Sequence, residues 1–196
     1  MVVVGVGTGR CGTQSIYKLV ESQKIAKCRH EFFLGKMGGT EHQRYYTSFG
    51  SNSYSRKDLL EKFILLRKDN REKVFFDIGP YYLDIIDDII NMEDVVLFSL
   101  KRDANSFSKS FCNYYNNTKG SNNYFRSDQY WNQIGLTSPD VMTEQDANIL
   151  HSKFYGRLSN HRIVEINTND LNKESIASTL SSIFSRDFSF KKYHIS

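Results

Sequence analysis

A glycine-rich stretch stands directly after the first apolar run of the chain. Val2–Val6 is followed by Gly7–Ser15, which holds three glycines, one arginine and several hydroxyl groups. Glycines allow a tight turn that aims backbone N–H groups at one anion, and a helix that begins there adds a favourable dipole. A glycine-rich turn that binds no ligand is the alternative. We expect a phosphate-binding loop, with contacts from Gly9, Arg10, Cys11, Gly12, Thr13, Gln14 and Ser15.

The position of the cation separates this loop from that of the nucleoside triphosphatases. Gly7 and Gly12 have the spacing of the G-x-x-x-x-G-K-[ST] pattern, but Thr13 stands where that pattern has lysine. Arg10 is the only cation inside the loop. Without the lysine, nothing in the loop would reach the β- and γ-phosphates of ATP. The loop therefore favours a different anionic ligand.

A second anion site is predicted after another buried strand. Arg102 follows the apolar run Val95–Leu100, and Ser110 comes eight residues later on a predicted helix. A phosphate monoester needs a guanidinium fork and a hydroxyl donor, which these two residues would supply. Taken alone, Arg102 could equally be a surface cation and Ser110 a residue on the surface of the helix.

A candidate general base lies at the end of the second predicted strand. His30 and Glu31 stand directly before Phe32 and Phe33. A base beside apolar walls suits proton abstraction, because desolvation raises the pKa of a carboxyl group towards neutrality. Phe32 and Phe33 could supply that wall. The alternative is that His30 and Glu31 are ordinary polar residues at a strand end.

Together these motifs resemble the sulfotransferases that use 3′-phosphoadenosine 5′-phosphosulfate (PAPS). Arg10–Thr13 is similar to the family's 5′-phosphosulfate loop, K/R-x-G-T followed by a helix, and Arg102 with Ser110 resembles its 3′-phosphate site. Ala104 stands where the family often has proline. The Gly- and Lys-containing cofactor segment near the C-terminus of the cytosolic drug and steroid enzymes is not visible. Glu31 before two phenylalanines is similar to the carbohydrate and bacterial members.

The resemblance implies that residues 1–196 form a single sulfotransferase domain. The domain would move the sulfuryl group of PAPS to a hydroxyl or amine of a carbohydrate, lipid or small metabolite, and release 3′,5′-ADP. Glu31 would be the general base, with His30 as its rival, and Arg10 would stabilise charge on the leaving 5′-phosphate. We expect no metal site and no obligatory magnesium. The alternatives are a nucleotide-dependent kinase with a degenerate loop and a non-catalytic nucleotide-binding module.

Two further residues have open roles. Asp77 follows the third predicted strand, where it could hydrogen-bond the acceptor or a cation of the cofactor site, or serve only in a turn. Trp131, or a tyrosine within 116–131, could stack on adenine, although ordinary packing is the favoured interpretation.

Short apolar runs alternate with segments of helical periodicity along the chain. We predict strands at 2–6, 27–30, 74–76, 95–100 and 162–166. Helices are predicted at 14–22, 55–67, 80–90, 104–115, 143–158 and 176–184, the last capped by Asn172. Residues 35–54 are expected to be irregular, and 116–142 to form a loop-like flap. This alternation predicts an α/β fold with a central parallel sheet of about four or five strands, flanked by helices, and a P-loop-like phosphosulfate-binding loop.

Composition narrows the partners and the location. The net charge of +4 comes from Lys and Arg spread along the chain, which suits a small anionic ligand and argues against nucleic acid. Cys11, Cys28 and Cys112 are odd in number and lack C-x-x-C spacing, so we expect reduced thiols. No apolar run reaches the roughly 18 residues of a membrane span, and no export signal is evident. We expect a cytoplasmic protein that takes a small-molecule or carbohydrate acceptor.

Overall fold

Five parallel strands form the centre of the part of the chain that the structure describes. The computed structural model describes residues 1–34, 55–118, 124–170 and 174–185. Within them the strands are β1 (Val2–Val6), β2 (Lys27–Cys28), β3 (Phe75–Ile78), β4 (Val95–Lys101) and β5 (Val164–Asn167). Their order is β2-β3-β1-β4-β5, and each neighbouring pair is parallel. The predicted α/β fold, a central parallel sheet flanked by helices, is therefore confirmed.

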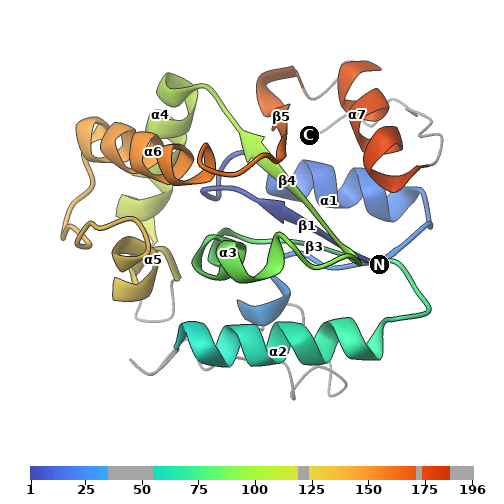
Figure 1. The fold of residues 1–196 in the computed structure, drawn as a ribbon. Coiled ribbons are helices and arrows are strands. Elements are labelled where there is room, and N and C mark those ends of the chain that lie inside the picture. Colours follow the sequence, from blue (N-terminus) through green and yellow to red (C-terminus); the bar gives the residue numbers. More distant parts are fainter. Residues whose placement is uncertain (35–54, 119–123, 171–173, 186–196) are drawn as a thin grey trace.

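The helices lie on both faces of the sheet and at its end (Figure 1). One face is covered by α1 (Thr13–Ser22) and α7 (Glu174–Phe184), and the other by α2 (Arg56–Asp69) and α3 (Ile86–Ile89). At the end where β1 terminates stand α4 (Ala104–Asn117), α5 (Asp128–Asn132) and α6 (Glu144–Leu158). The segment 35–54 and the predicted cap Asn172 lie outside the described residues.

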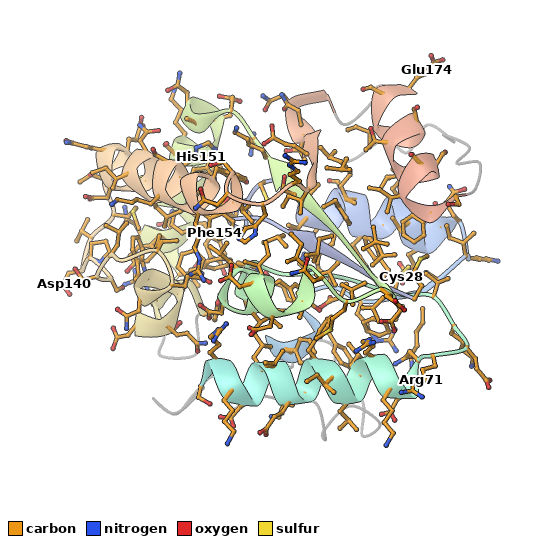
Figure 2. The ribbon with its side chains drawn as sticks, in the orientation of Figure 1. Cys28, Arg71, Asp140, His151, Phe154 and Glu174 are labelled. Carbon is orange, nitrogen blue, oxygen red and sulfur yellow. The ribbon has the colours of Figure 1, made fainter. Side chains whose placement is uncertain are left out.

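Alternate strand residues supply two apolar cores, because successive side chains of a strand point to opposite faces. Val3 packs with α1 and α7, whereas Val2 and Val4 belong to a larger, aromatic-rich core on the opposite face. Side chains fill the space between the ribbons around α6, where His151 and Phe154 are labelled (Figure 2). No helix among the described residues is long and apolar enough to cross a membrane.

The segment after β3 differs from the prediction. The sequence predicts one helix over 80–90, but Pro80–Ile85 forms a 3₁₀ helix (η3) and only the four residues of α3 follow as α-helix. Every side chain of η3 is buried, so the segment is packed on all sides rather than along one stripe. Tyr81 and Tyr82 both turn back to Asp77 at the end of β3.

The flap predicted over 116–142 is also more ordered than expected. Its described part contains the 3₁₀ helix η4 (Tyr124–Arg126) and α5, so the loop-like interpretation is wrong there. The reason is aromatic burial, since Phe125, Tyr130 and Trp131 are each at most 3% exposed. The indole N–H of Trp131 donates to the carbonyl of Phe125 at 2.9 Å. Trp131 thus serves packing, as favoured from the sequence, and is not available to stack on adenine.

Candidate anion-binding site

The loop after β1 passes through left-handed backbone positions. The φ angles of Gly9, Arg10 and Gly12 are 77°, 52° and 86°. Gly12 is the N-cap of α1 and has no side chain, so no capping side chain accepts from the first N–H groups of the helix. A Cβ at Gly9 would lie 2.4 Å from the ring of Phe125, so a side chain has no room there. The loop and the dipole of α1 together favour an anion.

Arg10 connects this loop to α4. Its Nε donates to the hydroxyl of Ser110 at 3.3 Å, and its guanidinium lies 5.2 Å from the centre of the Tyr114 ring. The carbonyl of Arg10 accepts from the guanidinium of Arg102 at 3.3 Å. The residues predicted for two separate anion sites therefore lie side by side.

The Arg102 end of β4 is fixed by its neighbours. The carbonyl of Arg102 is 2.8 Å from Nε2 of His151, and burial lowers the pKa of His151, so the neutral ring donates this bond. Asp103 caps α4 by accepting from the N–H of Ser106 at 2.8 Å. Hydrogen bonds from Ser106 hold the pKa of Asp103 below its usual range. The N–H of Asp103 donates to the side chain of Asn169, directly after β5, at 3.3 Å.

Both candidate bases stand beside the loop. The N–H of Glu31 donates to the carbonyl of Ile78 at 2.8 Å, which continues the pairing of β2 with β3 beyond Cys28. Glu31 is 7% exposed and has a φ of 51°. Nε2 of His30 is 3.0 Å from the hydroxyl of Thr13 at the start of α1.

The two phenylalanines after Glu31 do not form the apolar wall that the sequence suggests. Phe32 packs against Phe75 with ring centres 5.4 Å apart, and Phe33 packs against Tyr81 at 5.6 Å. Both rings are buried in the core and neither lines the site. Aromatic surface at the site comes instead from Phe125 and Tyr114.

A cavity of about 840 Å³ lies where these segments meet. It is beyond the carboxyl ends of the strands, where open parallel sheets bind ligands, and its size suits a small molecule. Among the described residues, its walls carry two guanidinium groups and two carboxyl groups. Within the described parts of the chain, no group of three His, Cys, Asp or Glu is placed to hold a metal ion. The lining residues are Arg10, Gly12, Thr13, Gln14, Ser15, His30, Glu31, Arg102, Asp103, Ser106, Tyr114, Phe125, Thr168 and Asn169.

Eight of the predicted site residues line this cavity, and three do not. Gly9 packs against Phe125, Cys11 is fully buried beneath the loop, and Ser110 lies behind Arg10. Asp77 is also fully buried and does not line the cavity, so it is not placed to contact an acceptor or a cation of the cofactor site. The geometry favours the other interpretation, in which Asp77 supports a turn, as described below.

Six lining residues were not singled out from the sequence. Thr168 and Asn169 directly follow β5, and the rule that ligands bind beyond strand ends could have pointed to them. Asp103 and Ser106 could have been found as the cap and first turn of α4. Tyr114 comes four residues after Ser110 on α4, so helical spacing could have pointed to it, whereas Phe125 is brought to the cavity by long-range packing.

Comparisons with known proteins leave the site to be interpreted from its own chemistry. No protein-family model and no curated protein matches the chain. Among solved structures, the chain is similar to an uncharacterized protein from Eubacterium ventriosum, with 14% sequence identity and a TM-score of 0.47. That similarity covers 95% of this chain and 99% of the other.

Proposed function

We propose that this chain is a sulfotransferase that binds PAPS across the β1–α1 loop and Arg102. The observation that carries the proposal is that Arg10 is hydrogen-bonded to both residues of the second candidate site. These are Ser110 and Arg102, which are 100 and 92 residues away in sequence. PAPS has two separate anionic ends, a 5′-phosphosulfate and a 3′-phosphate. Two adjoining candidate anion sites, whose guanidinium groups Arg10 and Arg102 both line one cavity, suit such a ligand.

The binding roles follow from the positions of the groups. The N–H groups at the start of α1 and the guanidinium of Arg10 would hold the 5′-phosphosulfate. Arg102 and Ser110 would hold the 3′-phosphate. The hydroxyl of Ser110 accepts from Arg10 in the structure, so its own hydrogen would be the one donated to a phosphate at this place.

The proposed chemistry is a single displacement at sulfur. PAPS supplies an activated sulfuryl group, whose bond to the 5′-phosphate oxygen breaks. Glu31 accepts the proton of the acceptor hydroxyl or amine as the acceptor atom bonds to sulfur. Arg10 and the loop N–H groups stabilise the charge left on the 5′-phosphate of 3′,5′-ADP. His30 is the alternative base, and a carbohydrate or another small molecule is the proposed acceptor.

A thermal-shift panel of 3′,5′-ADP, 5′-AMP, ADP and ATP-Mg tests the ligand. We expect 3′,5′-ADP to raise the melting temperature most, because only it occupies both anion sites. At 100 times its Kd it would stabilise the fold by about 2.7 kcal/mol. A larger shift with ATP-Mg would favour a kinase, whose loop normally has lysine where Thr13 stands. Binding of 3′,5′-ADP without turnover of PAPS with any acceptor would favour a non-catalytic nucleotide-binding module.

A further inference from the structure

We propose that Asp77, outside the cavity, is a positioning residue that holds Glu31 at the cavity wall. The inference rests on the proposed function only in taking Glu31 as the base. The contact between Asp77 and the turn after Glu31 is independent of any reaction. Asp77 is the third residue of β3 and pairs with Val4 of β1, so it is anchored in the middle of the sheet.

Glu31 has a backbone conformation that needs support. Its φ of 51° is in the left-handed region, which residues with a Cβ rarely occupy. Such conformations persist where the surroundings hold them, and they concentrate at functional sites. The turn after Glu31 also sends Phe32 and Phe33 into the core while Glu31 itself lines the cavity. A rotation of this backbone would therefore move the carboxyl group of Glu31 away from the loop.

Three consecutive N–H groups tie this turn to β3 and η3. The N–H of Glu31 donates to the carbonyl of Ile78 at 2.8 Å. The N–H of Phe32 donates to both carboxylate oxygens of Asp77, at 3.2 and 3.3 Å. The N–H of Phe33 points to the hydroxyl of Tyr81 at 3.4 Å. Of these three acceptors, the carboxylate of Asp77 is the one that accepts from the N–H of Phe32, the residue directly after Glu31.

The carboxyl group of Asp77 is itself held by two hydroxyls. Tyr81 and Tyr82 donate to its Oδ2 at 2.5 and 2.7 Å. Asp77 has no exposed surface, and a buried carboxyl group is costly unless donors surround it. The three donors converge on a group that only accepts when ionised, so an amide would introduce competing N–H groups. Asp77 thus joins β3, η3 and the Glu31 turn in one network.

Amide hydrogen exchange tests the contact without any assumption about function. At pH 8, above the raised pKa of Asp77, we expect the amide of Phe32 to exchange roughly tenfold faster or more in Asp77→Asn, since it loses a buried charged acceptor. Asp84→Asn is the matched control. Asp84 is also a buried aspartate of this region, 8% exposed, but its carboxyl group accepts from Gln129. Exchange of the Phe32 amide should be unchanged in Asp84→Asn.

A double-mutant cycle tests whether Asp77 acts through Glu31. With PAPS and an acceptor, Asp77→Asn should lower kcat by roughly tenfold or more and leave the Kd of 3′,5′-ADP within about threefold. Asp84→Asn should leave both unchanged. In the Glu31→Gln background, adding Asp77→Asn should lower kcat by no more than about twofold, because residues that act as a unit are non-additive. If Asp77→Asn caused a general structural defect, the fold-decreases in kcat of the two single variants would instead multiply in the double variant.

The outcomes separate this inference from the proposed function. Unchanged exchange at Phe32 in Asp77→Asn, or additive losses in the cycle, would overturn the role of Asp77. An absence of PAPS turnover in the unmodified protein would overturn the proposed function. The exchange result would still show whether Asp77 holds the N–H of Phe32. If Asp77→Asn does not fold, Tyr81→Phe replaces it, since it removes one donor to Asp77 and the partner of Phe33. Faster exchange at Phe33 is then expected, and unchanged exchange would contradict the network.

Discussion

Arg10 is the residue at which the two predicted anion sites meet. It is exposed, yet its side chain is oriented towards α4 by the hydroxyl of Ser110 and by the ring of Tyr114. A guanidinium can bond in its plane and stack through its face at once, which an ammonium group cannot do. The choice of arginine at this position therefore links the loop to the helix as well as supplying charge.

Arg102 and Ser110 should determine the selectivity for a 3′-phosphate. We expect Arg102→Ala to erase the preference for 3′,5′-ADP over 5′-AMP. Ser110→Ala should reduce it by about 1–2 kcal/mol, in line with one hydrogen bond to a charged group. Calorimetric titration of both nucleotides measures the preference directly.

Lys101→Ala is the control for this selectivity. Lys101 is the cation next to Arg102, but its ammonium lies 3.4 Å from Glu165 and it does not line the cavity. The preference should persist in Lys101→Ala. If it also persists in Arg102→Ala, the 3′-phosphate site has been placed wrongly.

The loop between β1 and α1 and the described part of the flap, η4 and α5, constrain one another's shape. Gly9 is in contact with Phe125 of η4, and the hydroxyl of Tyr130 in α5 donates to the carbonyl of Thr8 at 2.8 Å. The described part of the flap is thus in direct contact with the loop. Its aromatic residues pack against the candidate anion site without contributing charge.

Gly9→Ala should destabilise the fold through this contact. A methyl group there meets both a left-handed φ of 77° and the Phe125 ring at 2.4 Å. We expect a loss of about 2–4 kcal/mol in the free energy of unfolding, measured with urea. Gly135→Ala has a similar φ of 68° but nothing within 4 Å, so about 1 kcal/mol is expected. Equal losses in the free energy of unfolding of the two variants would mean that the Phe125 ring moves aside for the methyl group.

The local parts of the fold and site could be predicted from the sequence, whereas the long-range parts could not. The β1–α1 loop and the strands have signals within a few residues of one another, such as the glycines before Thr13. The position of Phe32 and Phe33 depends on how a single turn is oriented, which composition does not encode. Likewise, the helix predicted from Pro80 is tightened by two hydroxyls that bond to Asp77, and the flap is ordered by aromatic packing.

For the whole molecule, two buried carboxyl groups should make stability depend on pH. Burial raises the pKa of Asp77 and of Asp84 from 3.8 to about 7. At these two groups the folded chain binds more protons than the unfolded chain between these values, so their contribution to stability falls as the pH rises from about 4 to 7. His151, whose pKa burial lowers, acts in the opposite direction below its ordinary pKa of 6.5, but it is one group against two. Between pH 5 and 8 we expect a loss of roughly 1–3 kcal/mol per carboxyl group.

Urea unfolding at pH 5 and pH 8 measures this dependence. Asp84→Asn should flatten the profile, since it removes one of the two groups. Asp140→Asn, at an exposed position, should leave the profile unchanged. A stability that increases from pH 5 to pH 8 would contradict the assignment of these two carboxyl groups.

The burial of Cys11 has a consequence for the chemistry of the loop towards oxidants and alkylating agents. Burial raises the pKa of Cys11 to about 11 and that of Cys28 to about 12. Because the thiolate is the reactive form, both thiols are protonated and shielded at neutral pH. The sulfur at the centre of the loop is thus inert while the fold is intact. Cys112, which is only partly buried, is the thiol at which a probe can be attached.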